Sequence, residues 1–358
     1  MDFGLSEEQR LLEQTMRRFL AEALPTARVR EIMATETAHD PKLWRALAEL
    51  GVAGVLVAEE HGGGGLGLLD AVVAAQSLAH AAAPAPFLGS SVMAAVALAA
   101  AGSPAQRSEW LPRIADGSAC LGVAATELAS RRGGAGLREN GGRLAGTALF
   151  ALDAGAADAF LVALDPDRIA LVPRAAEGLE IAMLSTVDRT RRVAELTFDA
   201  SRPVDWIRGD EVALRMLAAG RVALAADLLG ACERAVEMAV DYAKQRQQFG
   251  RPIGSFQAVK HLCAEMVAEL EPARSLVWYA GHAFEQRPEE APLLAAHAKA
   301  HLAEVGTQIA RTATEVHGGI GFTDEHDLHL WFKRVGLDRQ LLGGPDVLRE
   351  EAAKLQGW

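Results

Sequence analysis

The segment KQRQQFGRPIGSFQAVKHLCAEM, residues 244–266, carries the most information about the fold. Its helical pattern is interrupted near Gly250, and Ser255 is a candidate N-cap for a second helix. Arg246 and Gln257 therefore flank one turn, where an arginine and an amide can hold a pyrophosphate while Phe249 packs on an aromatic ring. The same residues also suit solvated helix ends, so this segment alone leaves both interpretations open.

Helical patterns extend on both sides of this segment. Between residue 2 and about residue 118, apolar residues recur at helical spacing. After residue 207 the pattern predicts helices at about 210–247, 255–285, 291–317, 324–335 and 345–356. Gly318 is a predicted break and Thr323 a candidate N-cap. Between about 119 and 207 short β-type runs such as AFLVAL (159–164) alternate with turns. The sequence therefore predicts a mainly helical α+β fold with domains at 1–118, 119–207 and 208–358, the last long enough for a four-helix bundle.

Composition narrows the classes of function. The net charge of −11 argues against a nucleic-acid partner, and the longest low-charge run, 71–108, is broken by prolines and glycine, which argues against a membrane span. The amphipathic opening does not resemble a signal peptide, so we expect a cytoplasmic protein. The three cysteines lie far apart without a zinc-binding pattern, so we expect free thiols and no metal site.

A glycine-rich stretch at residues 61–67 contains the pattern GxGxxG. A dinucleotide-binding fold needs an acid about 20 residues later for the ribose. No Asp or Glu occurs between Asp70 and Glu109, and no repeated strand–helix units follow. We therefore interpret the stretch as a loop between helices.

Two segments resemble signatures of the flavin-dependent acyl-CoA dehydrogenase family: residues 244–266 and EVHGGIGFTDEHDLHLWFKR, residues 315–334. Weaker matches cover the rest of the chain in order. The resemblance implies an N-terminal helical domain, a middle β-barrel-like domain and a C-terminal four-helix bundle, assembled as a dimer or tetramer. It also implies FAD as cofactor and an acyl-CoA thioester as substrate.

In that family a carboxylate removes the α-proton of the acyl-CoA while the β-hydrogen leaves as hydride to FAD. The position that matches the usual glutamate is Gly343 in this chain. Some relatives place the glutamate on the first long helix of the bundle, before an arginine, and that position is Gly220, before Arg221. Neither position has an acid, so the resemblance assigns no catalytic residue here.

The flavin contacts that the resemblance implies divide into two groups. Those made to a subunit's own flavin are largely lost: the loop that starts at Thr126 lacks the family's glycines, Phe150 to Leu152 replaces a Trp-containing element, and Pro345 replaces a threonine. Thr126 itself remains a candidate contact. Those made to a neighbouring subunit's flavin are largely kept, and they are Arg246, Phe249, Gln257, Glu315, Gly318 and Gly319.

Three interpretations follow. In the first, the chain is the non-catalytic small subunit of a heteromeric acyl-CoA dehydrogenase, a heterotetramer in which a homologous subunit carries the glutamate, as among relatives that act on steroid side-chain or dicarboxylic acyl-CoAs. In the second, the chain is a self-sufficient homo-oligomer with a relocated base, for which the candidates are Asp346, Asp338, Asp210 and Glu211. In the third, it is a flavin-free scaffold or regulatory protein.

Overall fold

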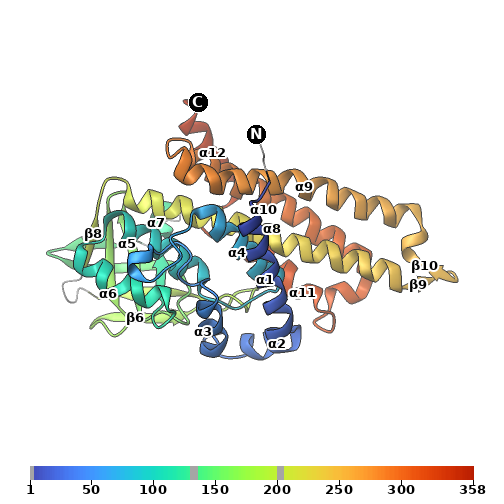
Figure 1. The fold of residues 1–358 in the computed structure, drawn as a ribbon, viewed down its shortest axis with the longest axis horizontal. Coiled ribbons are helices and arrows are strands. Elements are labelled where there is room, and N and C mark those ends of the chain that lie inside the picture. The colour runs from blue at the N-terminus through green and yellow to red at the C-terminus, as the bar shows by residue number, and fades with distance from the viewer. Residues whose placement is uncertain (1–3, 130–135, 200–204) are drawn as a thin grey trace.

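The computed structural model describes residues 4–129, 136–199 and 205–358. A broad body contains the eight-stranded sheet and the N-terminal helices, and a rod of long helices projects from it (Figure 1). The N-terminal region begins with a helix that Ser6 and Gln9 cap reciprocally. Its helical elements are α1 (Glu7–Ala23), α2 (Thr26–Met33), α3 (Pro41–Glu49), η1 (Glu59–His61), α4 (Leu68–His80), the π-helix η2 (Phe87–Ala94), α5 (Ala95–Ala101) and α6 (Pro104–Ala115).

The middle region is an eight-stranded sheet with one short helix, α7 (Thr126–Ala129). Its strands follow the order β6-β7-β3-β1-β4-β5-β8, and β2 pairs with β3 beside this path. The predicted β region is therefore present, and in the described residues its pairings form an open path that ends at β6 and β8 and does not close into a barrel. The strands are β1 (Leu121–Ala124), β2 (Arg138–Asn140), β3 (Arg143–Leu152), β4 (Ala159–Asp165), β5 (Arg168–Pro173), β6 (Leu179–Met183), β7 (Val193–Phe198) and β8 (Asp205–Arg208).

The C-terminal region is a bundle built around one central helix, α8 (Val212–Gln245), which packs against α4, α9, α10 and α11. Gly230 permits the close approach of α4, because a side chain there would collide with the carbonyl of Gln76. The mainly helical fold with a middle β region is thus confirmed. The other bundle helices are α9 (Gln257–Gln286), α10 (Ala291–His317), α11 (Leu328–Asp338) and α12 (Pro345–Leu355).

Two predicted helix caps are wrong. Ser255 lies in a single 3₁₀ turn, η3 (Ile253–Ser255), and Phe256 precedes the first residue of α9. Thr323 follows the 3₁₀ segment η4 (Gly318–Phe322), where its hydroxyl donates to the carbonyl of Ile320. In both places the side chain is a good capping group, but the preceding backbone completes a 3₁₀ turn before the helix begins.

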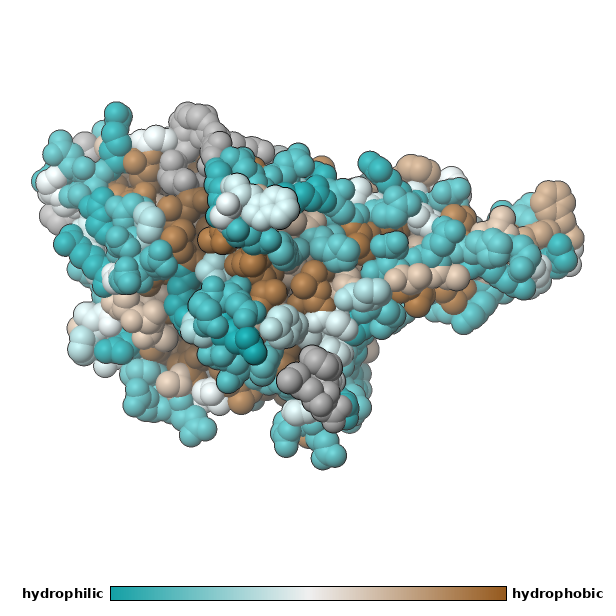
Figure 2. All heavy atoms as spheres, turned by 90° about the horizontal axis from the view of Figure 1, so that it is seen from above, coloured by the Kyte–Doolittle hydropathy of each residue, from teal (hydrophilic) through white to brown (hydrophobic). Residues whose placement is uncertain are grey.

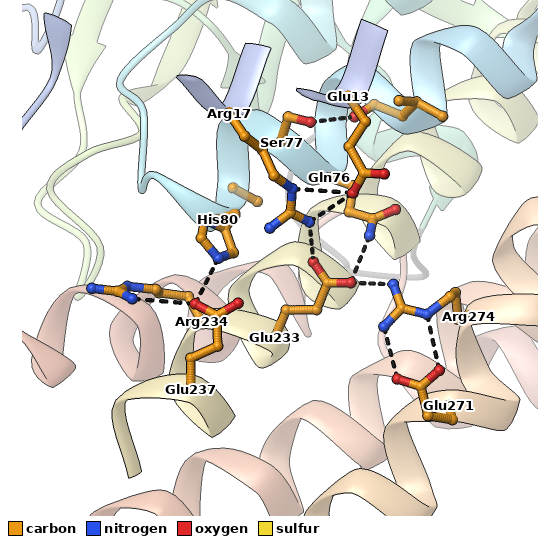
Figure 3. Close-up of polar contacts among 12 residues, drawn as sticks. Glu13, Arg17, Gln76, Ser77, His80, Glu233, Arg234, Glu237, Glu271 and Arg274 are labelled. Atoms are coloured by element: carbon orange, nitrogen blue, oxygen red, sulfur yellow. Dashed lines mark hydrogen bonds and ion pairs between the residues drawn. The ribbon is translucent and has the colours of Figure 1, made fainter. Parts of the chain in front are cut away.

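A polar cluster joins the N-terminal helices to the bundle, as Figure 3 shows. Glu233 of α8 accepts hydrogen bonds from Arg17 of α1 and Gln76 of α4, both at 2.6 Å, and from Arg274 of α9. Glu233 is 7% exposed, so its charge is compensated by these donors and not by water. The cluster fixes α1 and α4 against the rod that carries the candidate site.

Two further sequence predictions concern loops and membranes. The segment before the glycine-rich stretch forms turns and the 3₁₀ element η1, and the glycines lead directly into α4, so the stretch is a loop between helical elements. None of the described helices is both long enough and apolar enough to cross a membrane.

Candidate functional site

The free end of the rod carries a two-residue hairpin turn. Strands β9 (Gln247–Gln248) and β10 (Arg251–Pro252) pair antiparallel, and the turn between them places Phe249 at φ 52° and Gly250 at φ 75°. Positive φ at both turn residues favours asparagine and glycine, whereas phenylalanine is strained there. Phe249 is nevertheless 91% exposed, and hydrophobic atoms lie at the extreme tip in Figure 2. A strained backbone that presents an aromatic ring to solvent indicates a binding surface.

Arg246 and Gln257 stand at the base of this hairpin. The backbone of Arg246 is fixed, because its amide donates to Tyr242 and its carbonyl accepts from the amide of Ile253, each at 2.8 Å. Its side chain is exposed, and within the described residues no group forms an ion pair or hydrogen bond with the guanidinium. Gln257 is the first residue of α9 and is also exposed. Both side chains are therefore available to a ligand.

The end of α10 provides an open glycine pair. Gly318 ends the helix at φ 65°, and a Cβ on Gly318 or Gly319 would meet nothing within 4 Å. At Gly319, where φ lies in the ordinary range, neither space nor conformation within this chain requires glycine. Glu315, Gly318 and Gly319 also line a groove of about 650 Å³ between α10 and α11, whose wall includes Phe322, itself 76% exposed. The groove leaves room for a group from outside the chain to contact the backbone.

Ring contacts bring the two predicted segments together. Tyr242, one turn before Arg246, stacks on His317 with ring centroids 4.6 Å apart. His317 is 3% exposed, so it is a packed residue at the helix end. The six positions that match neighbour-flavin contacts therefore share one end of the rod, whereas Thr126 starts α7 in the body at the opposite end (Figure 1).

A second pocket surrounds Gly343. Its volume is about 390 Å³, and it is lined by Ala125, Ala129 and Phe150 of the β region and by residues between 337 and 347. Gly343 has φ 108°, and a Cβ there would lie 3.1 Å from the carbonyl oxygen of Ala129 and 3.2 Å from Cδ2 of Leu348. The conformation at this position strongly favours glycine, and the surrounding atoms leave little room for a side chain.

The alternative base position is also closed. A Cβ on Gly220 would lie 2.6 Å from Sδ of Met93 and 2.8 Å from Cδ1 of Leu342. These distances are shorter than van der Waals contact, so a glutamate cannot enter without moving both side chains. An acid at Gly220 would therefore require movement of Met93 and Leu342, and one at Gly343 would require a strained backbone and a small shift of its neighbours.

Two buried cations hold the loop that carries Gly343. Arg221 donates from Nε to the carbonyl of Leu342 at 3.0 Å and forms a forked pair with Glu351 of α12 at 2.6 and 2.8 Å. Lys299 donates from Nζ to the carbonyls of Arg339 at 3.2 Å and Gly343 at 3.4 Å. Burial lowers the pKa of Lys299 to about 7. The sequence did not predict these contacts of Lys299, because the local pattern does not show which distant carbonyl groups the side chain of a lysine on α10 reaches.

The four acids considered as relocated bases lie in three different settings. Asp338 is fully buried and pairs with Arg191 at 3.0 Å, so it has no access to substrate. Asp346 is exposed at the start of α12 and lines the 390 Å³ pocket. Asp210 and Glu211 precede α8, and neither lines that pocket.

A buried charge network fills the space where α8, α11 and the turn before β7 meet. Arg334 forms a forked pair with Asp227 at 2.7 and 2.8 Å, and Arg191 contacts the same carboxylate at 2.7 Å. The cavity that borders the network measures only about 10 Å³. Arg191 is therefore a buried ion-pairing residue.

Comparison with known proteins decides the family. Residues 6–118 match the family described as "Acyl-CoA dehydrogenase, N-terminal domain", and residues 208–355 match "Acyl-CoA dehydrogenase, C-terminal domain". The chain belongs to the acyl-CoA dehydrogenase family. It is 34% identical to acyl-CoA dehydrogenase IpdE2 from Mycobacterium tuberculosis, over 96% of this chain and 96% of that protein.

Two solved structures are similar over almost their whole length. The ChsE4-ChsE5 complex from Mycobacterium tuberculosis contains a chain that is 30% identical with a TM-score of 0.92, covering 100% of this chain and 99% of that chain. A variant of the Tcur3481-Tcur3483 steroid ACAD contains a chain that is 32% identical with a TM-score of 0.90, covering 98% of both chains. Each of these two relatives has a two-part name, and the first is described as a complex.

The two regions of this acyl-CoA dehydrogenase chain differ in how well they fit FAD, the cofactor of the family. The rod end fits a pyrophosphate and its neighbouring groups, since it offers a free guanidinium at Arg246 and unobstructed backbone at Gly318 and Gly319. The pocket at Gly343 fits a flavin ring poorly. Among its described lining residues the only polar side chains are Arg339, Gln340 and Asp346, and none carries a hydroxyl.

Proposed function

We propose that this chain is the non-catalytic small subunit of a heteromeric acyl-CoA dehydrogenase and completes the FAD site of a homologous partner that carries the glutamate. One contrast within the chain carries the proposal. The rod end presents Arg246, Phe249 and the open glycine pair outward, while Gly343 has no acid, a backbone conformation that disfavours a side chain and little room for one. A chain that has lost its own base position but keeps the outward-facing contacts serves a site on another subunit.

The relatives support a two-component assembly. The ChsE4-ChsE5 complex and the Tcur3481-Tcur3483 steroid ACAD are each named as two components, and both resemble this chain over nearly all of its length. We therefore propose a heterotetramer with a homologous catalytic subunit, and a substrate of the acyl-CoA class. The steroid ACAD makes a steroid side-chain thioester the first substrate to test.

The chemistry divides between the subunits accordingly. FAD, when bound, accepts the hydride from the β-carbon of the acyl-CoA. Arg246 would hold the pyrophosphate through charge-assisted hydrogen bonds from its forked guanidinium donors. The backbone at Gly318 and Gly319 permits close approach of the cofactor, and Phe249 supplies an apolar cover. The proton transfer is left to the partner's carboxylate.

The test is the FAD affinity of the complex when this chain carries Arg246→Ala. Losing a charge-assisted contact costs about 1.5–3 kcal/mol, which is roughly a ten- to hundredfold increase in the FAD dissociation constant. Arg251→Ala is a matched control in the same hairpin, because its guanidinium lies 4.1 Å from the ring of Phe256 and the same charge is removed. FAD titration into the apo complex should distinguish the two variants. Equal affinities for wild type and Arg246→Ala would contradict the shared site.

A self-sufficient dehydrogenase is the second candidate, and one observation favours it. Asp346 is the one acid among the four candidate bases that lines the pocket at Gly343. It is fully exposed and lies 3.7 Å from Arg349, an arrangement also expected of a helix-start carboxylate. Turnover of acyl-CoA by the chain alone, abolished by Asp346→Asn, would establish this alternative.

A further inference from the structure

Three aromatic side chains meet directly behind the two segments that face the flavin in the proposed function. Tyr242 lies near the end of α8, His317 is the last residue of α10, and His326 precedes α11. The rings of Tyr242 and His317 stack with centroids 4.6 Å apart and planes 28° apart. His326 lies 4.5 Å from His317 and meets Tyr242 edge-on at 6.1 Å. We call these three residues the ring stack.

The central ring of the stack is a neutral imidazole. Nδ1 of His317 lies 2.7 Å from the carbonyl of Ala313, so Nδ1 carries the proton and Nε2 carries the lone pair. Nε2 is buried and has no partner among the described residues. Burial, together with nearby His326, lowers the pKa of His317. His317 therefore packs against both other rings, and the three rings form a triangle, because Tyr242 and His326 also meet edge-on at 6.1 Å.

Backbone bonds connect the ring stack to the flavin-facing groups. The amide of Arg246 donates to the carbonyl of Tyr242 at 2.8 Å, so the backbone of Arg246 is fixed one helical turn after that of Tyr242. His317 is bonded covalently to Gly318, the first residue of the open glycine pair. The third ring, His326, is held at the start of α11, because its Nδ1 accepts a hydrogen bond from the amide of Leu328 at 3.2 Å. Each ring is thus fixed to the end of a different helix.

We propose that the ring stack is a positioning device that sets the spacing between the guanidinium of Arg246 and the backbone of Gly318 and Gly319, so that both engage one FAD. The proposal rests on the proposed function. The rings act through Arg246 and Gly318, because His317 is enclosed by its neighbours and its free nitrogen is buried. Without the stack, the ends of α8 and α10 lose their ring contact beside the flavin-facing groups, although the two helices still pack along their length.

The experiment compares Tyr242→Phe and Tyr242→Ala in the complex isolated through a tag on this chain, with FAD titrated into the apo form. Tyr242→Phe keeps the ring, so its dissociation constant should stay within about threefold of wild type. Tyr242→Ala removes the ring, and we expect about tenfold weaker binding, the upper end of what an aromatic pair supplies. The conservative variant thus restores the affinity that the alanine variant loses.

A double-variant cycle separates positioning from a general loss of stability. If Tyr242 acts through Arg246, Tyr242→Ala should weaken FAD binding little further when Arg246→Ala is already present. Full multiplication of the two effects in the double variant would overturn the proposal. So would wild-type affinity in Tyr242→Ala beside a weakened Arg246→Ala, a result that leaves the proposed function intact. Wild-type affinity in Arg246→Ala would instead overturn the proposed function, and this inference with it.

A second variant covers the case in which Tyr242→Ala fails to fold. His326 lies outside the helices and is only partly buried, so the His326→Ala complex should still fold, with a small decrease in thermal unfolding temperature from the lost hydrogen bond to the amide of Leu328. We expect it to weaken FAD binding by about three- to tenfold, because the His317 ring loses one of its two ring contacts. Wild-type FAD affinity in a folded His326→Ala complex would overturn the proposal.

Discussion

Substitution of Gly343 should destabilise the chain without creating a catalyst. A side chain at φ 108° lies in a region open essentially to glycine, and holding a non-glycine residue there costs about 1–3 kcal/mol. The new Cβ would also lie 3.1 Å from a backbone oxygen, that of Ala129, which cannot rotate away. We therefore expect Gly343→Ser to lower the free energy of unfolding by about 1–3 kcal/mol, with the close contact adding to the strain.

Gly344→Ser is the matched control. Gly344 has φ −73° and ψ 165°, an extended conformation that any residue adopts, and its new Cβ would meet only Oε1 of Gln340 at 3.3 Å. Serine is also a favourable N-cap for α12 at this position, so the control should be neutral or slightly stabilising. Urea denaturation followed by circular dichroism measures both variants. Equal stabilities would refute the argument from conformation and space.

The catalytic half of the same prediction uses Gly343→Glu. Purified without a partner, this variant should not oxidise acyl-CoA, since a carboxylate without a well-held flavin on the other face of the substrate supplies only half of the reaction. The assay is reduction of an artificial electron acceptor with an acyl-CoA panel. Measurable turnover by the single variant alone would refute the reasoning.

Two further predictions concern Lys299 and Phe249. Burial lowers the pKa of Lys299 to about 7, so between pH 7 and about 10 the unfolded chain binds more protons than the native chain. The free energy of unfolding should therefore rise with pH, by up to about 1.4 kcal/mol per pH unit from this residue. Lys299→Met should lack that rise in urea denaturation at pH 7, 8 and 9, and parallel pH profiles for wild type and variant would contradict the prediction. Phe249→Asn should leave the free energy of unfolding unchanged or raise it by up to about 1 kcal/mol, because asparagine tolerates positive φ. The same variant should weaken FAD binding by the complex. A loss of stability with unchanged FAD affinity would contradict this prediction.

Local signals in the sequence predicted the helices well where breakers are strong. Predicted helix 291–317 coincides with α10, because Pro292 suits its first turn and Gly318 ends it at positive φ. The β9–β10 hairpin was not predicted, since two-residue strands carry no alternating pattern. Nor was the network of Asp227 with Arg191 and Arg334, whose members lie 36 and 107 residues apart along the chain.

The candidate site shows the same division. Resemblance named positions on two separate segments, and the structure places both segments at the end of the rod. The resemblance could not show why residues 343 and 220 are glycines, since the reason lies in contacts with Ala129 and Met93, which are distant in sequence. The ring stack was missed for the same reason, because Tyr242 and His326 gain a role only when three helix ends converge.

The ratio of FAD to protein tests the central claim most directly. The chain purified alone should be colourless or poor in flavin, because its own pocket offers no hydroxyl among the described lining residues and its outward contacts have no flavin to hold. The complex isolated through a tag on this chain should be yellow, and Arg246→Ala in this chain should strip its FAD while the subunits stay associated. A yellow homo-oligomer of this chain alone, loaded with one FAD per chain and turning over acyl-CoA, would contradict the account.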